Sequence, residues 1–197
     1  MIDSIVFVTS NSGKVATLEG HLKIHGLDRV TVIQQALDLI EPQAETALEV
    51  ARVKAQQAFD QLQRPVLVDD SSFHIHALGG FPGPYVKYMN ETVGAEGIVR
   101  FMEHQDDRQA YFLSALVFVD KEGVLHEFSV KESTGEIARE VRESVAGHGW
   151  SDLWKIFVPA GSTKTLSQMT PQDHEARRKS ENGRSAYDLF ATWLRDN

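Results

Sequence analysis

Hydrophobic and polar positions near the start of the chain follow two different periods. Residues 5–9 form a short apolar run and residues 29–34 alternate, as β-strands do. Between them, Val15, Leu18 and Leu22 recur at helical spacing before Gly26. A strand, a tight loop, a helix and another strand are typical of the beginning of an α/β unit.

A longer helix is predicted over residues 45–63, with small and apolar side chains on one face. Thr46 and Glu49 have the spacing of a capping box, which gives Glu49 a structural role. Glu41 lies in the preceding loop, residues 38–44, and has no capping role. Glu41 is therefore the better candidate for a metal ligand.

The rest of the pattern predicts further strands and helices. Strands are expected at residues 65–68, 109–119, 124–131 and 156–159, with a turn at 121–123 that makes the two long strands a hairpin. Helices are expected at residues 84–89, at 94–104 and from about 173 onward. The last helix has a buried stripe made of Tyr187, Phe190, Trp193 and Leu194.

Composition narrows the function classes. The chain has 197 residues, no cysteine and a formal net charge of −8. Without a sustained basic stripe, binding to nucleic acid or to a membrane surface is not expected. No apolar run reaches membrane-spanning length and no signal-peptide pattern opens the chain. Together with the absence of cysteine, this predicts a cytoplasmic protein.

Two adjacent carboxylates, Asp69 and Asp70, follow the apolar run of residues 65–68. Ser71, Ser72 and the Gly/Pro-rich residues 79–85 are expected to hold the following backbone in turns. Acids at the end of a buried strand suit a hard cation such as Mg²⁺, which usually arrives with substrate phosphates. The alternative is that both acids only solvate a strand end.

A polar turn, residues 10–14, joins the first strand to the first helix. Backbone N–H groups at a helix N-terminus form an anion site, and Ser10, Asn11 and Lys14 add donors and a positive charge. The turn is not a Walker loop, which needs Gly at Val8 and Ser or Thr at Val15. A plain loop with a solvated lysine is the alternative interpretation.

Two later segments carry aromatic and basic side chains. Trp150 and Trp154 flank Asp152, and such rings stack on a nucleobase or, more often, pack in a core. Arg177, Arg178 and Lys179 cluster near the start of the last predicted helix. They form either a solvated basic face or a contact to phosphate or base.

Taken together and in order, these segments resemble the inosine triphosphate pyrophosphatase family. Its Ham1-like members hydrolyse non-standard purine nucleoside triphosphates. Residues 9–14 are similar to the phosphate-binding loop of the family, and residues 68–71 to its acidic strand end. Residues 77–85 are similar to the loop that follows. Residues 149–161, with Lys164, Thr165 and Met169, parallel its base-binding segment.

The resemblance implies Mg²⁺-dependent hydrolysis to a monophosphate and pyrophosphate. It implies that Asp70 is the proton acceptor and a metal ligand, that Glu41 is the other metal carboxylate, and that Asp69 binds the metal through water. The phosphate-binding residues that it implies are Thr9, Ser10, Asn11, Lys14, Lys54, Ser71 and Lys87. For Lys54, a solvated helix lysine is the alternative.

The base-binding segment departs from the family pattern. The aromatic-Gly-aromatic-Asp-Pro run of the family has no Pro here, and its Asp is either lost or displaced onto Asp152. The family also has a Lys followed later by Ser-His-Arg. Aligned without gaps, the Lys position holds His174 and the Ser-His-Arg positions hold residues 178–180; with a short shift, the latter positions hold residues 180–182. Neither register contains His-Arg. The base contacts that the resemblance implies are Trp150, Asp152, His174, Lys179 and Ser180.

Three hypotheses follow. The first is an active pyrophosphatase with an altered base preference. The second is an enzyme that keeps inosine triphosphate activity because Asp152 and residues 177–179 substitute for the missing groups. The third is a nucleotide-binding sensor or partner protein without turnover. All three share an α/β fold in a single domain, residues 1–197, with a long twisted mixed β-sheet, flanking helices and a nucleotide cleft between two lobes. The resemblance also implies a homodimer.

Overall fold

The computed structural model describes residues 2–144, 151–180 and 185–197, with the backbone alone at residues 178–180. Two compact units share the chain. The first consists of Met1–Ser71, Ser114–Val130 and Gly183–Asn197, and the second of Ser72–Leu113 and Lys131–Asn182. Both units are therefore discontinuous in sequence.

The strands form a seven-stranded mixed sheet in the order β2-β1-β3-β5-β6-β7, with β4 paired to β3. β1 runs parallel to β2 and β3, whereas the β3–β4 and β6–β7 pairs are antiparallel. The strand bounds are Ser4–Val8 (β1), Thr31–Gln35 (β2), Val66–Ile75 (β3), Pro82–Gly83 (β4), Gln109–Val119 (β5), Leu125–Ile137 (β6) and Phe157–Pro159 (β7).

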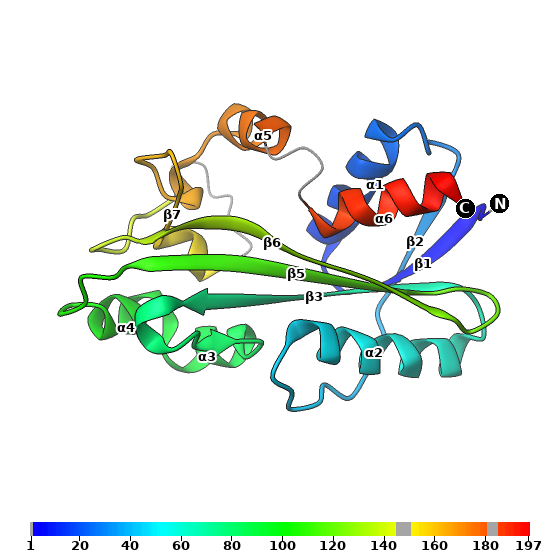
Figure 1. Cartoon of the computed structure of the whole chain (residues 1–197), viewed down its shortest axis with the longest axis horizontal. Helices are drawn as coiled ribbons and strands as arrows, with labels where there is room; N and C mark the ends of the chain where they lie inside the picture. Colours follow the sequence, from blue (N-terminus) through cyan, green and yellow to red (C-terminus); the bar gives the residue numbers. More distant parts are fainter. Residues whose placement is uncertain (1, 145–150, 181–184) are drawn as a thin grey trace. The chain divides into compact units, whose positions relative to one another are not determined.

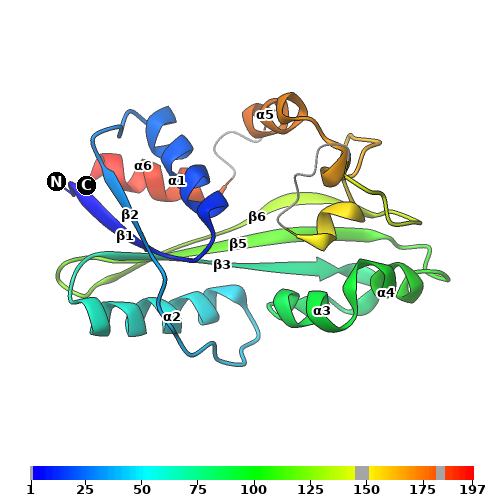
Figure 2. The same cartoon turned by 180° about the vertical axis from the view of Figure 1, so that it is seen from behind.

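In the first unit, helices cover both faces of the sheet. The bounds are Ser12–Ile24 (α1), Ala47–Leu62 (α2) and Ala186–Asp196 (α6). α1 and α6 lie side by side on one face, and α2 lies on the other (Figures 1 and 2). The buried side chains of α1 and α6, among them Leu18 and Phe190, form one core with strand residues such as Phe7. This packing fixes the end of β1 and the start of α1.

The second unit has its own core. Its α-helices are Val86–Thr92 (α3), Gly94–Phe101 (α4) and Pro171–Ser180 (α5), and its 3₁₀ turns are His76–Leu78 (η1), Asp152–Lys155 (η2) and Leu166–Gln168 (η3). Phe73 and Phe112 lie 4.5 Å apart between ring centroids, and Phe157 packs edge-on against both. Gly135 of β6 passes so close to β7 that a Cβ atom there would lie 2.2 Å from the carbonyl oxygen of Val158.

The α/β fold, the mixed sheet and the flanking helices confirm the prediction. The capping box of Thr46 and Glu49 is also present. Two predictions are wrong. Ser71 and Ser72 lie inside the ten-residue strand β3 and not in a turn, and the C-terminal region contains two helices, α5 and α6. The single domain and the nucleotide cleft stay predictions.

Among the described residues, no helix combines the length and the apolar character needed to cross a bilayer.

Candidate active site

The predicted phosphate loop is a capped helix N-terminus. Asn11 is the N-cap of α1, and its Oδ1 accepts hydrogen bonds from the backbone N–H groups of Gly13, at 2.8 Å, and Lys14, at 3.4 Å. Thr9 Oγ1 accepts from the N–H of Asn11 at 3.0 Å, and Ser10 is exposed. The loop thus has a fixed shape at the positive end of a helix, which favours an anion.

Lys14 is held beside this loop by the buried acid Asp69. Lys14 Nζ lies 3.3 Å from Asp69 Oδ2 and donates to the Asp69 backbone oxygen at 3.2 Å. The Tyr187 hydroxyl, from α6, donates to the same Oδ2. Asp69 is only 7% exposed, and no donor among the described residues reaches its Oδ1. Asp69 therefore faces the ammonium of Lys14 and a hydroxyl.

A second charged group contains Asp70, Lys54 and Glu41. Lys54 Nζ, from α2, donates to Glu41 Oε1 at 2.8 Å and to Asp70 Oδ2 at 3.0 Å. Glu41 comes from the loop before α2 and Asp70 from β3. Asp70 Oδ1 accepts from the backbone N–H of Ser71 at 2.9 Å. One ammonium thus bridges the two carboxylates that were predicted to bind metal.

Burial and charge act against each other on Asp70. Burial raises the pKa of the Asp70 carboxyl above its ordinary value, opposed by the positive charges of Lys54 and Lys14. For Lys54, burial lowers the pKa, but Asp70 and Glu41 outweigh it and the pKa is raised. A carboxylate with a raised pKa is a stronger base, which suits a proton acceptor.

The donor chemistry fits Mg²⁺ in a partial way. Carboxylate oxygens are the ligands that Mg²⁺ prefers, and Glu41 and Asp70 already surround a positively charged group, the Lys54 ammonium. Within the described residues, however, no three acidic or histidine side chains are grouped so that they could hold a metal ion. Asp69 in particular contacts Lys14 and Tyr187. A site completed by substrate phosphates needs only one or two protein carboxylates.

The base contacts implied by the resemblance belong to the second unit. Asp152 is half exposed and pairs with Lys155 at 3.2 Å, and the His174 ring packs on Trp154 at 5.1 Å between centroids. Trp150 and the side chains of Lys179 and Ser180 lie outside the described residues. Of the nearby basic cluster, Arg177 donates to Ser133 Oγ at 3.1 Å.

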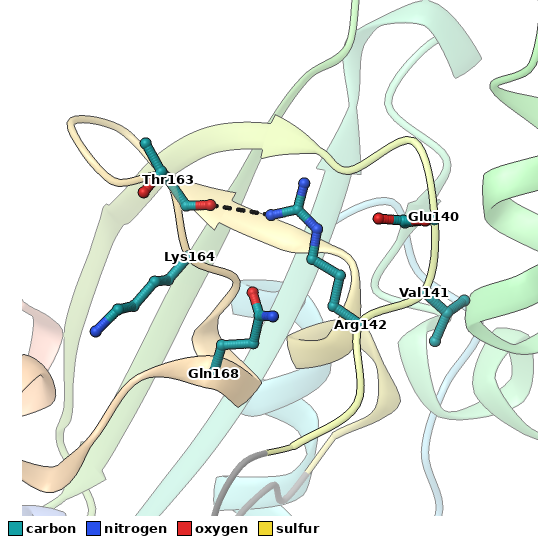
Figure 3. Close-up of a pocket in the computed structure, with 6 residues that line it drawn as sticks. All are labelled: Glu140, Val141, Arg142, Thr163, Lys164 and Gln168. Atoms are coloured by element: carbon teal, nitrogen blue, oxygen red, sulfur yellow. Dashed lines mark hydrogen bonds between the residues drawn. The ribbon is translucent and has the colours of Figure 1, made fainter.

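Two pockets of the second unit contain none of the individually predicted site residues, although Lys164 lines one and residues 158–161, from the segment that parallels the base-binding segment of the family, line the other. One, of about 590 Å³, is lined by Glu140, Val141, Arg142, Thr163, Lys164 and Gln168. In it, Arg142 donates to the carbonyl oxygen of Thr163 at 2.9 Å (Figure 3). The other, of about 470 Å³, lies along β6 and β7. Neither pocket contains a carboxylate pair bridged by lysine, so neither resembles a phosphate-transfer centre.

The first unit therefore brings together eight of the predicted residues, in two charged groups and one loop: Thr9, Ser10, Asn11, Lys14, Glu41, Lys54, Asp69 and Asp70. Ser71 joins them through its N–H. Lys87 is an exposed residue of α3 in the second unit. Tyr187 was predicted only as part of a buried apolar stripe and not as a site residue. Its hydroxyl, within that otherwise apolar stripe, was the only feature of the sequence that could have indicated a polar contact.

Comparison with known proteins places this geometry in a family context. A family model described as the Ham1 family matches residues 5–191. The chain is similar to a dITP/XTP pyrophosphatase of Thermococcus kodakarensis, with 36% identity over 193 residues and 98% of each chain covered. It is also similar to an inosine triphosphate pyrophosphatase 2 of Trypanosoma cruzi, with 34% identity, 95% of this chain and 90% of the relative covered.

Solved structures agree with the fold. The structure of a HAM1 protein of Coxiella burnetii superposes on this one over the full length of both chains, with a TM-score of 0.79 and 25% sequence identity. The Ham1 protein of Staphylococcus aureus covers 98% of both chains with a TM-score of 0.76 and 22% identity, which is a likeness of fold alone.

Proposed function

Because the chain belongs to the Ham1 family, we propose that it hydrolyses non-standard purine nucleoside triphosphates, such as dITP and XTP, to the monophosphate and pyrophosphate. The observation that carries the proposal is the group formed by Glu41, Lys54 and Asp70 beside the capped loop that holds Lys14. A pure nucleotide binder needs cations for phosphate, but it needs no proton acceptor.

In this reaction a water molecule attacks the α-phosphorus, its proton passes to a base, and pyrophosphate leaves. Asp70 is the proposed proton acceptor, because its carboxylate is largely buried and its pKa is raised. Lys14, Lys54, Ser71 and the loop residues Thr9, Ser10 and Asn11 are proposed to bind the triphosphate, and the two lysines neutralise its charge. We assign Lys87 the same task as a lesser contributor.

Glu41 and Asp70 are the proposed ligands of Mg²⁺, with Asp69 acting at most through water. A bound Mg²⁺ would supply charge neutralisation across the phosphate oxygens and polarise the phosphoryl group. Lys54, which lies between these two carboxylates, is proposed to donate to a phosphate oxygen of the substrate.

We propose further that the base preference differs from the usual inosine and xanthosine substrates. The support is the departure of the segment around Asp152 and His174 from the family pattern, since a base is discriminated by donors placed to bind it. Asp152 pairs with Lys155 at an exposed position, so its carboxylate is not held for a base by the surrounding protein. A homodimer, which the family resemblance supports, and a cytoplasmic location, which the absence of cysteine favours, remain proposals.

The test is pyrophosphate release with Mg²⁺ across a panel of triphosphates containing dITP, XTP, inosine triphosphate and the four standard nucleotides. Activity on the deaminated purines supports the proposal, and activity on another base would show a changed preference. Omission of Mg²⁺ should abolish release. Nucleotide binding without any release across the panel would overturn the enzyme assignment in favour of a sensor.

A further inference from the structure

We propose that Tyr187 is a positioning residue for the triphosphate, acting through Asp69 on Lys14, and this inference rests on the proposed function. The Tyr187 hydroxyl and the Lys14 ammonium bind the same oxygen, Asp69 Oδ2. Tyr187 itself does not belong to the predicted loop or to the acidic strand. It lies in α6, 118 residues after Asp69 in the sequence.

The two oxygens of the Asp69 carboxylate are used unequally, because both side-chain donors bind Oδ2. Among the described residues nothing donates to Asp69 Oδ1, although the atom is buried. A buried carboxylate is stabilised by the hydrogen bonds that it accepts. Its side chain therefore depends on two donors, the Tyr187 hydroxyl and the Lys14 ammonium. Loss of the hydroxyl would leave Lys14 as the one remaining side-chain partner of Asp69 among the described residues.

The Tyr187 ring is itself held on two sides. It stacks on His21 of α1, at 5.7 Å between centroids and with 16° between the planes, and it meets Phe7 of β1 edge-on at 6.5 Å. His21 Nδ1 in turn lies 2.8 Å from Asp188 Oδ1. The hydroxyl therefore has a fixed position relative to α1, the helix that carries Lys14.

This arrangement implies a function beyond packing. A phenylalanine at position 187 would keep the stacking and the edge contact and would lose the hydroxyl alone. With its second donor gone, Asp69 would hold the Lys14 ammonium more tightly to itself or would turn away from it. In both cases Lys14 is less able to meet a phosphate oxygen. The hydroxyl thus keeps Lys14 shared between Asp69 and the substrate.

The experiment compares Tyr187→Phe with the wild type by steady-state kinetics on dITP and by calorimetric titration with inorganic tripolyphosphate. We expect KM and the tripolyphosphate dissociation constant to rise about 10-fold, the scale of one hydrogen bond to a charged group, while kcat stays nearly constant. The matched control is Tyr111→Phe, which removes a hydroxyl in the second unit and keeps the ring beneath Lys131.

A double-mutant cycle tests whether the effect passes through Lys14. In a Lys14→Ala background, Tyr187→Phe should change tripolyphosphate affinity by less than about twofold, because the residue that it positions is gone. An equal loss in both backgrounds would overturn the proposal and leave a packing role. Unchanged affinity in the single variant would overturn it as well.

Two further outcomes are separated by the same data. If the wild type binds tripolyphosphate but releases no pyrophosphate from any nucleotide, the proposed reaction fails while the Tyr187 comparison still decides the positioning role. If the wild type does not bind tripolyphosphate, both proposals fail. Should Tyr187→Phe not fold, Asp69→Asn, which removes the charge that holds Lys14, must change the tripolyphosphate dissociation constant, and an unchanged constant in that variant would overturn the proposal.

Discussion

The proposed phosphate-binding residues of the first unit and the base segment of the second unit differ in how their side chains are held. In the first unit, Lys54 binds two carboxylates at once and Lys14 binds a buried one. In the second unit, the half-exposed Asp152 forms a partly solvated ion pair with Lys155. Fixed, partly buried charges suit a triphosphate, which is common to every substrate. The partly solvated ion pair leaves the Asp152 carboxylate less constrained by the surrounding protein.

The largest effect is expected for Asp70→Asn. Loss of the proton acceptor and of a metal ligand should lower kcat on the order of 1,000-fold, because general-base catalysis contributes on that scale. Pyrophosphate release from dITP measures it, with Asp60→Asn on the exposed face of α2 as the control. A variant that keeps near-wild-type turnover would remove Asp70 from the mechanism.

The same variant has a testable effect on stability. The folded-state pKa of Asp70 is raised above its ordinary value of 3.8, so the folded protein holds this proton more tightly than the unfolded chain does. The contribution of this group to the free energy of unfolding is therefore present at low pH and lost as pH rises through the raised pKa. Asparagine has no such proton, so the Tm of the wild type relative to Asp70→Asn should fall over that range.

Lys14→Ala should raise KM by roughly 10- to 100-fold and leave kcat nearly unchanged, because a charge-assisted bond to the substrate is lost in ground and transition states alike. Lys23→Ala, in the last turn of α1, is the control within the same helix. An unchanged KM would contradict the assignment of residues 9–14 as a phosphate loop.

Lys54→Met should lower kcat/KM by about 10-fold and should move the acidic limb of the pH profile. The Lys54 charge lowers the Asp70 pKa against the effect of burial. Without it the Asp70 pKa rises further, so the base is protonated at a higher pH and activity is lost earlier on acidification. The pH dependence of kcat measures the shift, and a limb moving to lower pH would contradict the pairing.

The smallest effect is expected for Asp152→Ala in the base segment. An exposed, solvent-screened carboxylate should change the ratio of kcat/KM between dITP and XTP by less than about fivefold and leave tripolyphosphate binding unchanged. A much larger change would show that Asp152 is held in place when a base binds. The contrast between the two units would then apply to the free protein only.

Local signals in the sequence predicted local structure well. The Thr46–Glu49 capping box and the Asn11 turn depend on neighbours three residues apart, and both are present. Ser71 and Ser72 were predicted to hold the backbone in turns because serines favour turns, but pairing within the sheet continues β3 through them. Tyr187 and Asp69 meet across 118 residues, a contact that only the tertiary fold creates. Base contacts were the least predictable, because the family pattern is broken there.

The division of β3 between the two units has a consequence for how this protein can be cut or rearranged. The chain passes from one unit to the other after Ser71, Leu113 and Val130, in each case in the middle of a strand, and again after Asn182. Cleavage of the chain at one position therefore releases neither unit as a continuous fragment. For the same reason, neither unit could be replaced by that of a relative through exchange of one continuous segment. The turn at residues 121–123 lies within one unit and joins β5 to β6. New chain ends placed at this turn would leave every strand whole.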